Sequence, residues 1–399
     1  MSRRNFIKQG SMLAGGFMLH HPLAKAIGRE EKITVGIIGC GDRGKGLMTI
    51  LNQLPGIFEI TAICDVLDFR FAEAKKVYNS ARLKEYKDHR QLLADKSIKA
   101  VIIAVPLYLH FSIARDALGA GKHVYLEKTM TYNIPQALEL VQEAGKHPKQ
   151  ILQIGHQYRY TPLYYRVKDM IEKDYLGKVS QIECRWDRNN NWRRPVPDPS
   201  LERRINWRMY REYSGGMPAE LLSHQIDFIQ WAFNCRPDTI LASGGIDVYK
   251  DGRETFDNVQ ATIRYEKQGM IGSFGATQGN QHEGYSFKIK GTKGMVSLLV
   301  DEGIFYPEPD TRKELQTIDG VAGATKIEWK NDGGIPILKE KTKDGSWYAL
   351  QDFYKSITQQ RTPDSNVKTG ATTAISVAMI NASLFEKNIQ TWKNNYTIT

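Results

Sequence analysis

Apolar residues follow two different patterns in the two halves of this chain. From residue 31 to about residue 154, short runs rich in Val and Ile alternate with segments whose apolar residues recur at helical spacing. Such alternation predicts a parallel sheet covered by helices on both faces. The predicted strands are 33–38, 58–64, 100–105, 123–126 and 151–154, and the predicted helices are 43–54, 69–79, 89–94, 111–120 and 135–146.

After residue 155 apolar and polar residues alternate at hairpin spacing, with turn signals such as Gly291-Thr292-Lys293-Gly294. This pattern predicts an α+β domain with a large, mostly antiparallel, open-faced sheet that packs on helices through one face. The other face is free to pair subunits, so we expect a homodimer or homotetramer. The predicted strands are 179–186, 240–248, 259–265, 269–276, 285–290, 295–299 and 304–306, and the predicted helices are 167–171, 347–357 and 372–385.

A glycine turn, Gly39-Cys40-Gly41-Asp42-Arg43-Gly44, joins the first predicted strand to the first predicted helix. Gly39 permits a tight turn, Gly41 lets the backbone approach a pyrophosphate, and Gly44 lets the helix pack close to the strand. The helix N-terminus adds free N–H groups and positive potential. The second strand ends at Asp65, where a carboxylate binds ribose hydroxyls and repels a 2′-phosphate. The pattern predicts an α/β Rossmann dinucleotide-binding domain that uses NAD in preference to NADP.

Two further predicted strands are followed by residues that could bind a ligand or take part in catalysis. The strand 100–105 stops at Pro106, and His110 follows at a predicted helix start, whereas the strand 123–126 stops at Glu127-Lys128-Thr129. Ligands of parallel sheets bind at the carboxyl ends of the strands. We therefore expect Glu127 and Lys128 at the mouth of the cleft, on the nicotinamide side, although such a pair is more often a solvated surface couple.

A segment without any period, residues 185–195, is rich in Trp, Asn, Asp and Arg, and the same composition returns at residues 206–208. Tryptophan faces stack on the C–H side of sugars, and Asn and Arg side chains satisfy sugar hydroxyl groups. An irregular loop with this composition is typical of a binding segment. The expected carbohydrate contacts are Trp192, Arg193, Asn206 and Trp207, and a structural or subunit-contact arm stays open as the alternative.

A helical pattern begins at Ala219, directly after a glycine pair. Glu220 and His224 are four residues apart, so a regular helix would place them on one face, where they could act in proton transfer. The same pair could hold zinc, but no third ligand is evident, and the four cysteines show no metal-ligand spacing. The sequence therefore predicts no metal.

The chain has 399 residues, of which 41% are apolar, and a formal charge of +11. Four of the positive residues, Arg3, Arg4, Lys8 and Lys25, lie in a segment that we expect to be removed, which leaves about +7. The arginines do not form a helical stripe, which favours a solvated basic surface over a nucleic-acid groove. A basic pocket for an acidic sugar is the open alternative.

The N-terminus has the features of an export signal. Ser2-Arg3-Arg4-Asn5-Phe6-Ile7-Lys8 is typical of the twin-arginine route, and Ala24-Lys25-Ala26 offers a cleavage site. The weakly apolar region between them is too short to remain as a membrane-spanning helix. The prediction is a periplasmic or otherwise exported protein with no membrane anchor after processing. The expected divisions of the chain are a signal peptide at 1–26, the NAD-binding domain at 31–154, the substrate and oligomerisation domain at 155–345, and closing helices at 346–399.

These motifs together resemble the Gfo/Idh/MocA oxidoreductases over nearly the whole mature chain. The resemblance rests on Gly39–Gly44 with Asp65, Pro106 with His110, Glu127-Lys128-Thr129, Gly155-His156-Gln157-Tyr158-Arg159, and Glu220 with His224. The family includes exported members that keep their cofactor bound, as glucose–fructose oxidoreductase does. The resemblance implies that Lys128 and His224, with Glu220, flank the substrate carbon that exchanges hydride with nicotinamide, either one serving as general acid/base.

The resemblance also implies two sets of contacts. The expected cofactor contacts are Gly39, Gly41, Asp42, Arg43, Gly44, Asp65, Pro106, His110, Glu127, Lys128 and Gln157. The expected substrate contacts are Arg159, Trp192, Arg193, Asn206, Trp207 and His224.

The predicted function is the oxidation of a secondary alcohol of a sugar or glycoside, at ring C3, with tightly bound NAD. The alternative is a redox-neutral NAD-dependent glycosidase that acts through transient 3-keto formation and elimination. That branch of the family lacks the Glu-Lys pair, so Glu127 and Lys128 favour a dehydrogenase. A non-catalytic NAD-bound scaffold is the third possibility, and the presence of both Lys128 and His224 argues against it.

Overall fold

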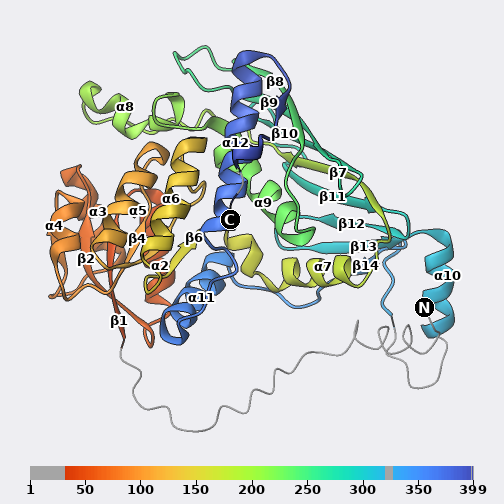
Figure 1. Cartoon of the computed structure of the whole chain (residues 1–399), viewed down its shortest axis with the longest axis horizontal. Coiled ribbons are helices and arrows are strands. Elements are labelled where there is room, and N and C mark those ends of the chain that lie inside the picture. Colours follow the sequence, from red (N-terminus) through yellow and green to blue (C-terminus); the bar gives the residue numbers. More distant parts are fainter. Residues whose placement is uncertain (1–31, 320–326, 397, 399) are drawn as a thin grey trace, which may run out of the picture.

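The computed structural model of the protein describes residues 32–319, 327–396 and 398, and contains two sheets flanked by helices (Figure 1). The predicted signal peptide, residues 1–26, lies outside the described residues. Within the described ranges, no helix combines the length and apolar character that crossing a membrane requires.

The first sheet has six parallel strands in the order β3-β2-β1-β4-β5-β6. Its strands are β1 (Ile33–Ile38), β2 (Phe58–Cys64), β3 (Lys84–Tyr86), β4 (Ala100–Ile103), β5 (His123–Leu126) and β6 (Leu152–Ile154). Its helices are α2 (Asp42–Asn52), α3 (Asp68–Val77), α4 (His89–Ala94), α5 (His110–Gly119) and α6 (Ile134–Lys146). The predicted Rossmann fold is therefore confirmed, and only the short, polar edge strand β3 escaped the sequence pattern.

The second sheet has nine strands in the order β14-β13-β12-β11-β7-β10-β9-β8-β15, antiparallel throughout except for the parallel pair β7 and β10. This confirms the predicted mostly antiparallel sheet. Its strands are β7 (Val179–Trp186), β8 (Thr239–Gly245), β9 (Asn258–Tyr265), β10 (Met270–Thr277), β11 (Tyr285–Gly291), β12 (Gly294–Leu298), β13 (Gly303–Pro307), β14 (Ile335–Pro336) and β15 (Gln390–Thr391).

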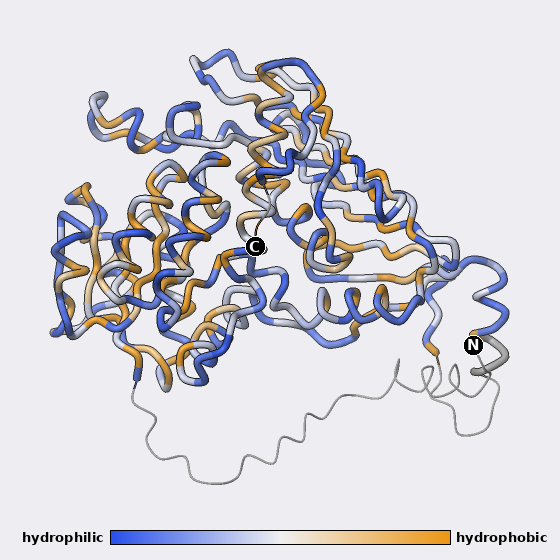
Figure 2. The backbone as a smooth tube through the Cα atoms, in the orientation of Figure 1, coloured by the Kyte–Doolittle hydropathy of each residue, from blue (hydrophilic) through white to orange (hydrophobic). Residues whose placement is uncertain are grey.

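Helices cover one face of this second sheet, and the hydrophobic segments in Figure 2 lie along its strands and the helices beside them. The main helices are α7 (Pro162–Glu172), α9 (Ser223–Ala232) and α12 (Val367–Glu386), and α10 (Pro309–Asp319) follows β13. The opposite face is open: Leu241 and Ile271 are 51% and 45% exposed on it. Strand alternation thus separates a buried face from a free one.

The C-terminal helices join the two halves. Helix α11 (Gly345–Gln359) packs on α2, and its Phe353 lies in one core with Phe58 and Tyr125 of the first sheet. Helix α12 packs on α6 from the first domain and on α9 and β8 from the second. The two domains are therefore held in one fixed arrangement by buried contacts.

A buried ion pair reinforces this junction. The Arg159 guanidinium donates to both carboxylate oxygens of Asp227, at 2.6 and 2.7 Å, and to the Asp364 backbone oxygen at 3.1 Å. Both Arg159 and Asp227 are about 1% exposed. Arg159 was predicted to contact substrate, and this prediction is wrong, since every part of its guanidinium is enclosed by protein groups.

Candidate active site

A cavity of about 810 Å³ opens at the carboxyl ends of β1, β2, β4 and β5 and extends to residues 194–220 of the second domain. Its volume lies in the upper range for small-molecule and cofactor sites. β1 lies between β2 and β4, so the cavity occupies the point where the strand order reverses, which is where open α/β sheets bind their ligands.

The glycine turn shows three different reasons for a missing side chain. Gly39 has a φ of +95°, and a Cβ there would lie 2.4 Å from the Ala104 oxygen. A Cβ on Gly44 would lie 1.9 Å from the Gly39 oxygen, so this residue allows α2 to approach the turn. Gly41 is different, because a Cβ there would meet no atom within 4 Å, and the residue lines the cavity. Its bare backbone and the uncapped N-terminus of α2 fit a dinucleotide pyrophosphate.

Asp65 faces the same cavity from the end of β2. Its carboxylate accepts hydrogen bonds from the backbone N–H of Cys40 at 2.8 Å and of Leu67 at 2.9 Å. These two bonds fix the carboxylate beside the glycine turn, which is the position from which it can accept hydrogen bonds from ribose hydroxyls. The residues present therefore fit NAD.

Three predicted cofactor contacts, Arg43, Glu127 and His110, line the cavity and form hydrogen bonds with other protein groups. Arg43 donates to the Glu127 carboxylate at 2.7 Å and to the Ser346 hydroxyl at 3.0 Å. The two ring nitrogens of His110 lie 2.8 Å from the Thr129 oxygen and 3.0 Å from the Val105 oxygen. Burial lowers the pKa of His110. These residues position the strand ends around the cofactor site.

The Lys128 amine lies in the cavity, where the second domain holds it. Nζ donates to the backbone oxygens of Glu220 at 2.9 Å and of Ala219 at 3.4 Å. Burial lowers the pKa of Lys128 below its ordinary value, and the carboxylates of Glu220 and Glu127 offset part of this shift. A lysine in this environment is suited to act as a proton acceptor.

Glu220 lies in a π turn, η5 (Pro218–Leu222), and not in a regular α-helix. The expected α-helical register between Glu220 and His224 is therefore wrong, since α9 begins only at Ser223. Glu220 accepts a hydrogen bond from Arg208 Nε at 2.8 Å. Burial alone would raise the pKa of Glu220, but the charges of Arg208 and Lys128 outweigh burial and lower it. π turns of this kind are frequent at functional sites.

His224 lies behind the cavity lining, packed against the rings of Tyr158 and Trp186 at centroid distances of 4.8 and 5.2 Å. Burial, together with the charge of Lys128, holds the pKa of His224 well below its ordinary value. Its Nδ1 is buried and makes no hydrogen bond with any described residue. His224 is therefore a neutral imidazole, and its catalytic role stays a prediction. No group of three potential metal ligands occurs in the described part of the chain.

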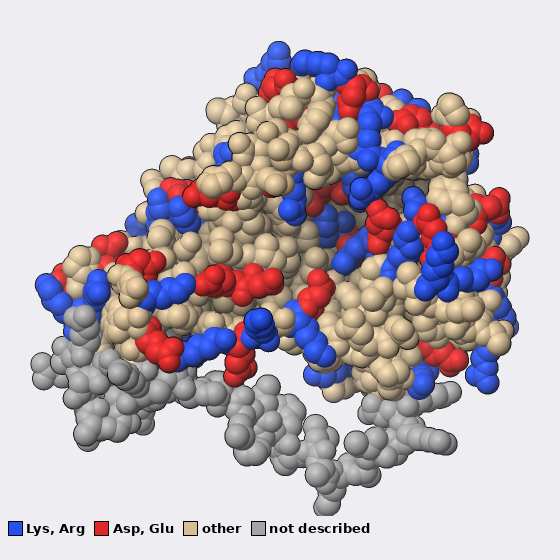
Figure 3. Space-filling view, turned by 180° about the vertical axis from the view of Figure 1, so that it is seen from behind, with Lys and Arg blue, Asp and Glu red and all other residues tan. Residues whose placement is uncertain are grey.

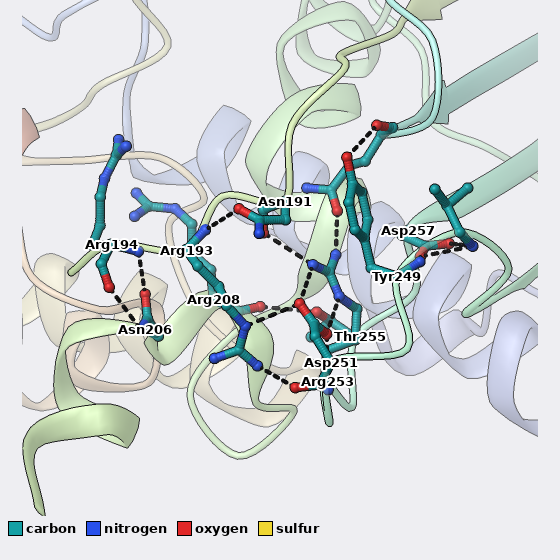
Figure 4. A network of polar contacts seen from close by, with 12 residues as sticks. Asn191, Arg193, Arg194, Asn206, Arg208, Tyr249, Asp251, Arg253, Thr255 and Asp257 are labelled. Carbon is teal, nitrogen blue, oxygen red and sulfur yellow. Dashed lines mark hydrogen bonds and ion pairs between the residues drawn. The ribbon is translucent and has the colours of Figure 1, made fainter. Parts of the chain in front are cut away.

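Three of the predicted sugar contacts do not line the cavity, so those predictions are wrong. Arg193 is held by an ion pair with Asp251 (Figure 4) and by a second one with Glu202. Asn206 is 3% exposed and bonds to the backbone of Arg194. Trp192 packs against the main hydrophobic core. These side chains build the segment instead of contacting ligand.

Among the other predicted residues, Gly44 lies outside the cavity lining and the rest line the cavity. Gly44 packs beneath the turn, as its close contact with Gly39 requires. The predicted residues that line the cavity are Gly39, Gly41, Asp42, Arg43, Asp65, Pro106, His110, Glu127, Lys128, Gln157, Trp207 and Glu220.

Sequence reasoning missed a group of basic and aromatic residues on the cavity wall, namely Arg194, Arg203, Arg204, Arg208, Tyr108 and Tyr213. A signal was present for two of the four arginines: Arg194 and Arg208 lie in the stretches singled out for their composition, residues 185–195 and 206–208, whereas Arg203 and Arg204 lie between these stretches. The composition of those stretches indicates sugar contact through Trp, Asn and Arg side chains, Arg193 among them, but it does not distinguish the arginines that line the cavity from those that pair within the protein.

Two family models match the chain. One describes an oxidoreductase family with an NAD-binding Rossmann fold and matches residues 33–156, and the other describes the GFO/IDH/MocA C-terminal domain and matches residues 164–297. An uncharacterized oxidoreductase of Synechocystis sp. is 26% identical over 369 residues, which are 86% of this chain and 91% of that protein. Inositol 2-dehydrogenase of Salmonella typhimurium is 27% identical over 203 residues, 51% of this chain and 55% of that enzyme.

Solved structures agree in fold. Levoglucosan dehydrogenase in complex with NADH and L-sorbose superimposes with a TM-score of 0.71 at 20% identity, covering 90% of this chain and 99% of that one. An oxidoreductase domain protein from Kribbella flavida gives a TM-score of 0.72 at 18% identity, covering 90% of this chain and 99% of that one.

The glycine turn yields a prediction that separates cofactor binding from folding. Gly41→Val should leave the melting temperature of the ligand-free protein near that of the wild type and abolish its increase with NADH, because the new side chain fills cofactor space only. Gly44→Val should lower the melting temperature itself, because its Cβ collides with the Gly39 oxygen. Thermal unfolding with and without NADH measures both effects. Retention of the NADH-induced increase in Gly41→Val would contradict the assignment of the cavity.

Proposed function

The chain belongs to the GFO/IDH/MocA family of NAD-binding oxidoreductases, and we propose that it oxidises a secondary alcohol of a sugar or glycoside, at ring C3, with NAD that it retains between turnovers. The observation that most supports this is the Lys128 amine, held inside the dinucleotide cavity by two carbonyl oxygens of the other domain. The relatives named for inositol and levoglucosan dehydrogenase activity support a polyhydroxylated substrate.

The hydrogen bonds of Lys128 support its role as the proton acceptor. A neutral amine has two N–H donors and one lone pair, and the oxygens of Ala219 and Glu220 accept from both donors. The lone pair is then free to take the proton of a substrate hydroxyl. NAD, when bound, supplies the hydride acceptor. The lowered pKa of Lys128 increases the share of the amine that is neutral at a given pH.

Trp207 and Arg208 of the second domain support sugar binding beside Lys128. The Arg208 guanidinium lies 4.3 Å from the centre of the Trp207 ring, and both residues line the cavity. The Glu220 carboxylate fixes Arg208 through its Nε, which leaves the remaining guanidinium N–H groups for sugar oxygens. We assign Trp207 to apolar contact with the sugar ring and Arg208 to its hydroxyls.

A second candidate function is the redox-neutral glycosidase, and His224 is the observation that favours it. After oxidation at C3, a base would take the C2 proton as the C1 substituent leaves, water would then add across the C1–C2 double bond, and the hydride taken from C3 would return to it. His224 lies directly behind the cavity lining, and burial and the charge of Lys128 hold its pKa well below its ordinary value, so a neutral imidazole is the candidate for that second base. Such a cycle consumes no external NAD.

The two functions give different products. Incubation with a panel of sugars and nitrophenyl glycosides should raise the absorbance at 340 nm for a dehydrogenase. A glycosidase would release nitrophenol with no accumulation of NADH. Lys128→Ala should lose either activity by roughly 100-fold or more, the usual contribution of a positioned base. Full activity in Lys128→Ala, with an unchanged melting temperature, would contradict the assigned role.

The charge around Lys128 predicts a shift in the pH profile. Lys128 accepts a proton only when neutral, so kcat/KM should rise with pH up to the pKa of its amine. Glu220 favours the charged ammonium, and Glu220→Gln should therefore lower the pKa of Lys128 and move the rise to lower pH. Glu212→Gln, which removes an exposed carboxylate paired with Arg203, serves as the matched control and should leave the profile in place. A rise that moves to higher pH in Glu220→Gln would contradict this account.

We also propose that the protein is exported by the twin-arginine route, on the support of Arg3-Arg4 and Ala24-Lys25-Ala26. A cofactor that leaves the cytoplasm with its enzyme has no free NAD to exchange with, which is consistent with retention. Replacing both arginines by lysine should trap the uncleaved precursor in the cytoplasm. Cell fractionation and the mass of the mature N-terminus measure this, and normal processing of that variant would refute the proposal.

The open face of the second sheet is our proposed subunit interface, in a homodimer or homotetramer. Leu241 and Ile271 give it exposed apolar side chains. The face of the molecule seen in Figure 3 has acidic and basic side chains interspersed. Light scattering of the purified protein measures the oligomeric state, and a monomer would refute the proposal.

A further inference from the structure

Residues 187–213, which we call the arm, extend from the end of β7 to the first domain. Their short helix α8 (Glu202–Ile205) lies beyond the edge of the second sheet, over the tips of the Rossmann helices (Figure 1). Two of the arm's contacts with the first domain bear on the cavity. Arg194 forms an ion pair with Asp42 at 3.2 Å, and the ring of Tyr213 packs on that of Tyr108 at 4.9 Å.

These two contacts lie on opposite walls of the cavity. Asp42 is the first residue of α2, beside the glycine turn after β1, whereas Tyr108 belongs to η1 (Leu107–Leu109), the loop after β4. β1 and β4 are neighbours, and the crevice between their ends is the dinucleotide site. The arm therefore crosses the crevice from one wall to the other.

A polar network fixes the arm in this position (Figure 4). The Asn206 side chain bonds to Arg194 twice, accepting from its N–H at 2.7 Å and donating to its backbone oxygen at 3.1 Å. Asp251 pairs with both Arg193 and Arg253, and Arg253 also donates to the Asn191 backbone oxygen at 3.0 Å. The arm is thus built in advance of ligand binding, so its ordering adds little cost when a ligand binds.

Four arginines of the arm differ in whether they form an ion pair. Arg194, Arg203, Arg204 and Arg208 all line the cavity. Arg194 pairs with Asp42, Arg203 with Glu212 and Glu254, and Arg208 with Glu220. Within the described residues, Arg204 is the one member of this set for which no ion pair with a carboxylate is found. Burial and Tyr213 raise the pKa of Tyr108, and the charge of Arg204 opposes this rise, which places Arg204 beside the wall of the crevice.

We propose that the arm is the second half of the dinucleotide site, in which Arg204 binds the pyrophosphate and the Arg194–Asp42 ion pair must open before the cofactor can leave. The inference deepens the cofactor retention proposed above. The glycine turn supplies backbone N–H groups from one side, and Arg204 supplies a guanidinium, the group best matched to phosphate oxygens, from the other. A cofactor enclosed in this way behaves as a prosthetic group.

The test measures the release of NADH from the full-length protein, by its fluorescence after mixing with excess NAD. Arg204→Gln should speed release roughly tenfold or more, the effect of losing one charge-assisted hydrogen bond to phosphate. Arg211→Gln is the matched control, because it removes the same charge from the same arm at a side chain that packs on Phe385 and is not part of the cavity lining. Its release rate should equal that of the wild type.

Asp42→Asn provides a second, independent variant in which two explanations predict opposite signs. If Asp42 acted only through its negative charge near the pyrophosphate, its removal would slow release. If the ion pair with Arg194 closes the site, its loss should speed release. Slower release from Asp42→Asn would overturn the role of the ion pair.

Competing ligands identify which part of the cofactor Arg204 binds. Arg204→Gln should weaken ADP-ribose roughly tenfold and leave adenosine, which has no pyrophosphate, unchanged. Unchanged binding of ADP-ribose would overturn the assignment, and would direct Arg204 to an anionic substrate instead. A wild-type protein that binds neither NADH nor ADP-ribose would overturn the proposed function as well, whereas equal NADH release from wild type and Arg204→Gln overturns this inference alone.

Discussion

The contact between the Lys128 amine and the carbonyl oxygens of Ala219 and Glu220 is the constraint on which the site depends. Lys128 follows a strand of the first domain, and both oxygens belong to a π turn of the second. The Ala219 oxygen also accepts from the hydroxyls of Thr129 and Ser223, at 3.1 and 2.7 Å. Each carbonyl oxygen has two lone pairs, so these oxygens can accept from a neighbouring domain as well as from their own helical turn.

Both domains therefore contribute residues to the site. The first domain supplies the glycine turn, Asp65 and the amine, and the second supplies the carbonyl oxygens, Glu220 and the arm. Neither domain alone contains a complete site. The helices α11 and α12 keep the domains in one arrangement, so that the position of Lys128 is set by buried packing far from the cavity. Rigid support of this kind is what a precise catalytic geometry requires.

The sequence predicted those parts of the fold and site that depend on local patterns. Gly39, Gly41 and Gly44 lie within six residues, and Asp65 follows at the end of the next strand. This pattern identified the cofactor turn because each of the three glycines stands where the turn, the helix packing or the ligand leaves no room for a side chain. Most strands were found because burial on one or both faces leaves a clear period. β3 was missed because it is short and polar, and β14 and β15 because each has only two residues.

What the sequence could not show were side-chain partners distant along the chain. Arg159 and Arg193 have the composition of ligand contacts, and only the folded chain places Asp227 beside one and Asp251 beside the other. The π turn at Glu220 is equally hidden, since its residues read as an ordinary helix. The sequence does not single out Arg204, because a guanidinium is available to a ligand only where no carboxylate pairs with it. Tertiary structure decides which arginines are paired.

The most direct measurement follows a single hydrogen. The retained cofactor is exposed to one equivalent of the active glycoside labelled with deuterium at ring C3, and the mass of the bound dinucleotide is measured before release. Our account predicts that the deuterium appears in the nicotinamide ring of the bound cofactor in wild type, and that Lys128→Ala acquires it far more slowly. If the wild-type enzyme turned over the labelled substrate and its bound cofactor never contained deuterium, hydride transfer at this site would be contradicted.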